Sequence, residues 1–150
     1  MSTLTEDAVL AILKETGAIL HGHFKLTSGR HSGTYVQCAR VLESPVHTSE
    51  LARGMADSVA GERVDVVAAP AVGGIIIGFA VAQALGVRFI FSERQDGRMT
   101  FRRGFSVAPG ERVLVVEDVV TTGGSVAEVV DLVRAAGGDV VAVASIIDRG

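Results

Sequence analysis

The feature that most limits the possible folds is the regular alternation of apolar and helical segments after Gly61. Four apolar runs predict strands: Val64–Ala69, Val87–Phe91, Val113–Val116 and Val140–Ile147. Two segments of helical character, Gly74–Leu85 and Ser125–Ala136, and one polar loop separate them. Continuous β-branched runs are typical of strands buried on both faces, as in parallel sheets covered by helices. The sequence therefore predicts an α/β fold with an open parallel sheet flanked by helices, built as a single domain over residues 1–150.

The N-terminal part of the chain is less regular. Amphipathic helices are predicted over Thr5–Thr16 and Ser49–Ala60, because each is followed by a glycine that can end a helix. Between them, His21–Ser32 is predicted to be a loop that leads into a short extended piece at Tyr35–Gln37.

Charge and composition exclude several classes of function. A net charge of −3 argues against a nucleic-acid partner, which would call for a basic surface. No charged residue lies between Asp65 and Arg88, but Pro70 and the Gly73-Gly74 pair interrupt this stretch, so a buried strand, loop and helix are favoured over a membrane span. The one cysteine, Cys38, cannot form an internal disulfide, which fits a reducing cytoplasm.

A strand followed by acids, glycines and a helix carries the clearest chemical signal. Val113–Val116 leads into Glu117-Asp118, and Thr121-Thr122-Gly123-Gly124-Ser125 then opens the next helix. Convergent glycine amides, hydroxyl donors and a helix N-terminus together form a phosphate cradle at the carboxyl end of a strand. Two carboxylates would repel a phosphate, so they suit sugar hydroxyls or a developing positive charge. The Walker A and Gly-x-Gly-x-x-Gly patterns do not occur here, and an ordinary strand–helix turn is the remaining alternative.

The polar segment Glu93–Gly104 is predicted to be a mobile loop that meets an anion. It carries four arginines, Arg94, Arg98, Arg102 and Arg103, and two glycines. A solvated hairpin without such a role is the alternative.

Two of these segments resemble the motifs of type I phosphoribosyltransferases. Val113–Val126 is similar to their motif for 5-phosphoribosyl 1-pyrophosphate (PRPP), and Ala69–Gly74 resembles their pyrophosphate loop. The resemblance implies that Glu117 and Asp118 hold the ribose hydroxyls and that the turn holds the 5′-phosphate. It also implies that the pyrophosphate loop and the arginine-bearing loop bind the pyrophosphate. The implied catalytic residues are Arg94, Arg98, Glu117 and Asp118. The implied PRPP-binding residues are Ala71, Val72, Gly73, Gly74, Arg94, Arg98, Thr100, Glu117, Asp118, Val119, Val120, Thr121, Thr122, Gly123, Gly124 and Ser125.

The base is indicated by segments outside these motifs. His23–Ser32, with Tyr35–Gln37, is similar to the N-terminal segment of orotate phosphoribosyltransferases, and Ser145–Gly150 resembles their Asp-Arg signature. In that signature the arginine binds orotate, and a guanidinium suits its carboxylate. The resemblance, which spans the chain from Gly22, implies a small N-terminal hood. It also implies an orotate site at Thr27, Ser28, Gly29, Thr121 and Arg149.

The resemblance implies a reaction, a metal and a partner. Ribose 5-phosphate would pass from PRPP to orotate, giving orotidine 5′-monophosphate and pyrophosphate in pyrimidine biosynthesis. Mg²⁺ would be held mainly by PRPP, with no protein ligand assigned. A cytoplasmic homodimer is implied, in which the loop reaches the neighbouring site, with no membrane or nucleic-acid partner. A purine phosphoribosyltransferase and a non-enzymatic PRPP-sensing regulator are the alternatives.

The chain also departs from the family pattern. Thr27 stands where many orotate enzymes have lysine, and Arg98 and Thr100 replace a loop lysine and histidine. Arginine can neutralise pyrophosphate but does not readily give up a proton. Family members usually continue past the Asp-Arg signature, so the sequence predicts that the C-terminal family element is absent or truncated.

Overall fold

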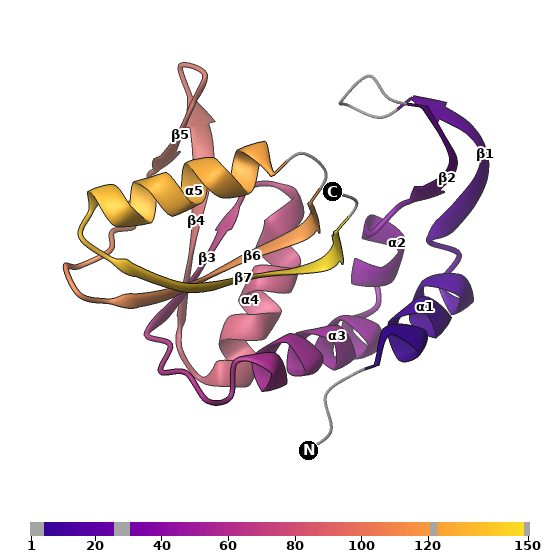
Figure 1. Cartoon of the computed structure of the whole chain (residues 1–150), viewed down its shortest axis with the longest axis horizontal. Coiled ribbons are helices and arrows are strands. Elements are labelled where there is room, and N and C mark those ends of the chain that lie inside the picture. Colours follow the sequence, from indigo (N-terminus) through magenta and orange to yellow (C-terminus); the bar gives the residue numbers. More distant parts are fainter. Residues whose placement is uncertain (1–4, 26–30, 121–122, 149–150) are drawn as a thin grey trace.

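The computed structural model describes residues 5–25, 31–120 and 123–148 (Figure 1). Five strands form the main sheet in the order β5-β4-β3-β6-β7, and β1 and β2 form a separate antiparallel pair. The elements are α1 (Glu6–Glu15), β1 (Ile19–Lys25), β2 (His31–Val36), α2 (Ala39–Leu42), α3 (Pro45–Ser58), β3 (Val66–Pro70), α4 (Gly73–Leu85), β4 (Arg88–Gln95), β5 (Arg98–Phe101), β6 (Arg112–Val120), α5 (Gly124–Ala135) and β7 (Asp139–Asp148).

Helices cover both faces of the sheet, as the uninterrupted apolar strands predict. Successive side chains of a strand point to opposite faces, so Val67 and Leu114 pack with α3 and α4 while Val66 and Val113 pack with α5. Figure 1 shows α5 on one side of the sheet and α3 and α4 on the other. The predicted α/β fold is confirmed.

Two small residues let α4 lie close to the strands beneath it. A Cβ added to Gly78 would come within 2.5 Å of the Phe89 ring, and one added to Gly74 would lie 2.9 Å from the Ala69 side chain. The helix ends at Gly86, whose φ of 72° is left-handed and therefore favours glycine.

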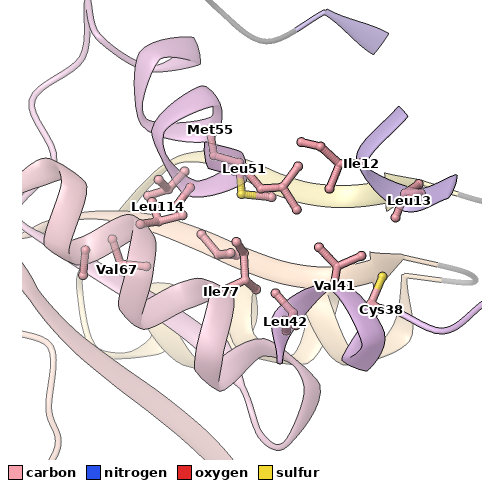
Figure 2. Close-up of a cluster of buried hydrophobic side chains, with 14 of the residues drawn as sticks. Ile12, Leu13, Cys38, Val41, Leu42, Leu51, Met55, Val67, Ile77 and Leu114 are labelled. Carbon is pink, nitrogen blue, oxygen red and sulfur yellow. The ribbon is translucent and has the colours of Figure 1, made fainter. Parts of the chain in front are cut away.

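The N-terminal elements join the α3–α4 side of the core through apolar side chains. Figure 2 shows Ile12 of α1 beside Leu51 of α3, and Val41 and Leu42 of α2 beside Ile77 of α4. The β1–β2 pair stands apart from the main sheet, on the side toward which the arrowheads of β6 and β7 point (Figure 1).

Three predictions of local structure are corrected. The segment Glu93–Gly104, predicted as a loop, is largely a β-hairpin: β4 continues to Gln95, and β5 pairs antiparallel with it as the edge strand. The segment His21–Ser32, predicted as a loop, contributes strand residues on both sides of residues 26–30. Helix α3 begins at Pro45, with Ser44 as its N-cap, rather than at Ser49.

No helix in the described part of the chain has the length and apolar character needed to cross a membrane.

Candidate active site

The loops after β3 and β6 lie at the point where the strand order reverses. From β3 the chain proceeds to β4 and β5 on one side, whereas β6, on the other side of β3, is followed by β7. β3 and β6 are parallel neighbours, so the loops that follow them lie at the same edge of the sheet. In open α/β sheets such a switch point is where ligands bind. The two segments that the sequence singled out are therefore brought together.

Glu117 and Asp118 stand at the end of β6 as a coupled pair of carboxyl groups. Glu117 is buried and Asp118 is partly exposed. The Asp118 amide donates to Glu117 Oε1 at 2.9 Å, and the Val119 amide donates to Asp118 Oδ1 at 2.7 Å. Burial, and then the neighbouring Asp118 carboxyl, raises the pKa of Glu117 to about 8. Near neutral pH the pair therefore carries about one negative charge fewer than two free carboxylates would, which reduces its repulsion of a phosphate-bearing ligand.

Cys38, at the N-cap of α2, lies near this pair. Burial and the negative charges of Asp118 and Glu117 raise the pKa of its thiol to about 12. A buried thiol in this environment stays protonated and unreactive. The start of α2 therefore lies near the acid pair, which no sequence signal indicated.

The predicted pyrophosphate loop lies against Asp118. A Cβ added to Gly73 would be 2.9 Å from each carboxylate oxygen of Asp118. The Ala71 amide donates to the Ser92 carbonyl at 2.8 Å, the Ala71–Val72 peptide bond is cis, and α4 begins at Gly73 without a side-chain cap. The amides at the start of α4 are therefore left for a ligand rather than used by a capping side chain.

The predicted phosphate cradle is a small hollow at the start of α5. Its volume is about 60 Å³, and it is lined by Glu117, Val119, Val120, Gly123, Gly124, Ser125 and Val126. Gly123, the N-cap, has a φ of 81°, and no side chain caps the helix. Uncapped amides and the helix dipole favour an anion at this position.

The arginines of the β4–β5 hairpin differ in their contacts. Arg94 forms a bidentate ion pair with Glu128 of α5, at 3.1 and 3.0 Å, and Arg103 pairs with Glu93 at 2.7 Å. Arg98 is exposed and forms no ion pair with any described residue. Thr100 donates its hydroxyl to the Arg98 carbonyl at 3.4 Å. Sequence reasoning missed Glu128, whose partner lies 34 residues away in the chain.

Part of the expected site lies outside the described residues. This is so for Thr27, Ser28 and Gly29, for Thr121 and Thr122, and for Arg149. The backbone before Arg149 is described: Asp148, the last residue of β7, is the register partner of Val120 at the end of β6. Within the described ranges, no group of three or more histidine, cysteine or acidic residues is placed to hold a metal ion.

Comparison with known proteins identifies the family. The phosphoribosyl transferase domain family matches residues 42–150. Orotate phosphoribosyltransferase from Pelotomaculum thermopropionicum is 56% identical over 146 residues, which cover 97% of this chain and 77% of that protein. The crystal structure of orotate phosphoribosyltransferase from Aeropyrum pernix superposes with a TM-score of 0.80 at 29% identity, covering 95% of this chain and 82% of that one. Adenine phosphoribosyltransferase from Thermoanaerobacter pseudethanolicus shares the fold, with a TM-score of 0.75 at 20% identity over 93% of this chain and 87% of that one. The chain belongs to the orotate phosphoribosyltransferase family, within the larger group that shares the phosphoribosyl transferase domain.

Proposed function

We propose that this protein transfers ribose 5-phosphate from PRPP to orotate, giving orotidine 5′-monophosphate and pyrophosphate in pyrimidine biosynthesis. The observation that carries the proposal is the acid pair, Glu117 and Asp118, between an uncapped phosphate cradle and the Gly73 loop. This arrangement offers acceptors for sugar hydroxyls between two sites for phosphate groups. The choice of orotate as the base is inferred from the orotate phosphoribosyltransferases among its relatives.

The acid pair and the cradle hold the ribose 5-phosphate in this proposal. Glu117 and Asp118 accept hydrogen bonds from the ribose hydroxyls, and the negative charge that the pair retains stabilises a ribose ring that becomes cationic as the C1–O bond breaks. Val119, Val120 and the turn Thr121–Ser125 surround the 5′-phosphate, with the amides of Gly124 and Ser125 at the helix N-terminus.

The leaving pyrophosphate lies at the loop Ala71–Gly74, with the arginines of the hairpin as its counter-charges. Arg98 is exposed and, in a homodimer, free to meet the pyrophosphate in the partner subunit's site, and Arg94 keeps N–H donors beyond those that face Glu128. Thr100 stands beside Arg98 on the same strand. Mg²⁺, when bound, neutralises pyrophosphate charge. Two adjacent carboxyl groups and a phosphate-rich substrate suit an ion held mainly by substrate oxygens and water.

Orotate is held, in this proposal, by the residues that the resemblance to orotate phosphoribosyltransferases implies. Arg149 pairs with its carboxylate, and Thr27, Ser28, Gly29 and Thr121 surround the ring. The ring nitrogen attacks C1 from the face opposite pyrophosphate, which departs with the electron pair of the broken bond. The N–H proton of the attacking nitrogen passes to a pyrophosphate oxygen.

A homodimer is part of the proposal. Ile76 and Phe79 are 53% and 61% exposed and lie on one face of α4, and Val72, the N-cap before this helix, is 82% exposed. Exposed apolar side chains that gather in this way form a patch typical of an interface. A dimer in sedimentation that Phe79→Asp dissociates would support this assignment.

A cytoplasmic location is also part of the proposal, because a reduced, buried Cys38 fits that compartment.

A substrate panel tests the activity. Purified protein is incubated with PRPP, Mg²⁺ and orotate, adenine, hypoxanthine, guanine or uracil, and nucleotide formation is followed by chromatography. Turnover with orotate alone supports the proposal, whereas turnover with a purine would make the protein a purine phosphoribosyltransferase. PRPP binding without turnover of any base would indicate a sensor. Asp118→Asn serves as the inactive control.

A further inference from the structure

Glu128 makes the contacts that tie the β4–β5 hairpin to the helix of the phosphate cradle. Its carboxylate accepts two hydrogen bonds from the Arg94 guanidinium, at 3.1 and 3.0 Å, and a third from the Met99 amide at 3.3 Å. It thus contacts both strands of the hairpin at once. None of the roles proposed above for PRPP or orotate uses it.

Apart from these polar contacts, the hairpin is held to α5 by apolar packing, in which Phe101 lies against the core cluster that contains Val126 and Val129. β5 is the edge strand and pairs only with β4. The Met99 side chain is buried, and the Ser92 hydroxyl approaches its sulfur at 3.4 Å. Arg94 also donates to the Gly97 carbonyl in the turn, at 3.2 Å. Glu128, Arg94 and Gly97 therefore form one connected path from the helix to the tip of the hairpin.

The contacts of Glu128 with Arg94 and Met99, here called the Glu128 clamp, lie close to the candidate active site. Glu128 follows Gly124 by one helical turn, which is about 6 Å along the axis of α5. The pairing of β3 with β4 ends at Pro70 and Ser92, so Arg94 lies two residues, about 7 Å, past the sheet edge where the loop Ala71–Gly74 begins. The same helix thus presents the cradle at its first residue and holds the hairpin one turn later.

We infer that Glu128 is a positioning residue, which fixes the direction in which the hairpin leaves the sheet and orients Arg94, so that Arg94 and Arg98 are presented to the leaving pyrophosphate. The catalytic role of the hairpin in this inference rests on the proposed function, whereas its attachment to α5 does not. Pairing with Arg94 also lowers the pKa of the Glu128 carboxyl from its ordinary value, so Glu128 stays charged at neutral pH.

The chain supplies a matched control at the other end of β4. Glu111 likewise accepts hydrogen bonds from a guanidinium, that of Arg88 at 2.7 Å, and from a backbone amide, that of Ala108 at 2.7 Å. Arg88 is the first residue of β4, so this clamp lies at the sheet edge opposite the site. Both glutamates pair with an arginine of β4 and accept a hydrogen bond from a backbone amide, but Glu111 accepts from Arg88 through one oxygen, and its amide partner is only three residues away.

Trypsin cleavage of the intact protein tests the attachment without any substrate. Glu128→Gln keeps an oxygen for the Met99 amide but loses the charge that holds Arg94, and Glu128→Ala loses both. Cleavage after Arg98, followed by mass spectrometry, is expected to be about fivefold faster in Glu128→Gln and faster again in Glu128→Ala. Glu111→Gln is expected to leave cleavage after Arg98 unchanged.

Steady-state kinetics test whether the attachment of the hairpin to α5 serves catalysis. Glu128→Gln is expected to lower kcat about tenfold with PRPP and orotate, while the KM for orotate and the melting temperature stay near those of the wild type. Wild-type cleavage and wild-type kcat in Glu128→Ala would overturn the inference, as would an equal loss in Glu111→Gln. If the wild type does not use orotate, the proposed function fails, but the cleavage rates still decide whether Glu128 holds the hairpin.

Discussion

The carboxylate of Asp118 lies directly over the backbone of Gly73, so that a Cβ on Gly73 would be 2.9 Å from both carboxylate oxygens. This contact joins the end of β6 to the start of α4, the two segments expected to hold the two ends of PRPP. The φ of Gly73 is not left-handed. Glycine is therefore required here by the close approach and not by the backbone conformation.

Gly73→Ala should remove activity while leaving the fold intact. The atoms that a Cβ would meet are the end of one side chain, which can rotate away at little cost to folding. The rotated carboxylate would no longer face the ribose hydroxyls, and kcat/KM for PRPP should fall at least tenfold, which corresponds to about 1.4 kcal/mol. Steady-state kinetics and thermal melting on the same samples measure both effects.

Gly61→Ala is the control, because an added Cβ there meets nothing within 4 Å. It should leave both activity and melting temperature near those of the wild type. Full activity in Gly73→Ala would mean that the position of Asp118 does not matter for the reaction.

The raised pKa of Glu117 predicts how stability depends on pH. Between the ordinary carboxyl pKa, near 4.5, and the folded value of about 8, the folded protein binds more protons at this group than the unfolded chain does. Stability is therefore lost as the pH rises through this window and is constant, for this group, above it. Glu117→Gln removes the titration, so it should gain stability relative to the wild type from pH 5 to pH 8.

Urea unfolding of both proteins at pH 5, 6.5 and 8 measures this difference. A shift of one pKa unit alone corresponds to about 1.4 kcal/mol, which such measurements resolve. Parallel stability profiles for the two proteins would show that Glu117 titrates normally in the folded state.

The sheet and the acid pair could be predicted because their signals are local. The strand Val113–Val116 is apolar on both faces, and the acids that follow it are therefore expected at the carboxyl edge of the sheet. β6 extends this strand to Arg112–Val120 and includes the acids, and α4 differs from its predicted range by one residue. Burial on both faces leaves little freedom in how such segments fold.

A hairpin was the alternative for Glu93–Gly104, and the sequence contains a turn signal that favours it. Asp96 and Gly97 have φ values of 54° and 80°, and an Asp-Gly pair with both residues left-handed is a typical two-residue hairpin turn. The four arginines and two glycines were instead interpreted as a mobile loop that meets an anion. Their acidic partners are Glu93, within the same segment, and Glu128, which only the folded sheet brings near. The mobility of the hairpin stays a prediction.

Arg149→Ala should change the use of orotate far more than the use of PRPP. Arg149 is the cation expected to pair with the orotate carboxylate, and the loss of a charge-assisted bond that leaves an anion unpaired costs about 2–5 kcal/mol. The KM for orotate should therefore rise at least tenfold while the KM for PRPP changes little. An unchanged orotate KM in the variant would remove Arg149 from the orotate site.

The last prediction concerns whether the hairpin acts in the active site of its own subunit or in that of the partner subunit. The apolar face of α4 adjoins β4, since the rings of Phe79 and Phe89 meet edge to face at 6.2 Å between centroids. A second copy docked on this face would lie beside the hairpin, and Arg98 is exposed and unpaired among the described residues. We expect Arg98 to act in the partner's site, so Arg98→Ala should lower kcat with little effect on the melting temperature.

Mixing the Arg98→Ala protein with an Asp118→Asn protein should then restore activity. Random exchange at equal concentrations makes about half of the dimers mixed, and one of the two sites in each would have both residues intact, giving roughly a quarter of wild-type activity. Each variant alone, treated in the same way, provides the baseline, and native mass spectrometry shows that exchange has occurred. If Arg98 served its own subunit, every site in a mixed dimer would lack one of the two residues, and activity would stay at the baseline despite exchange.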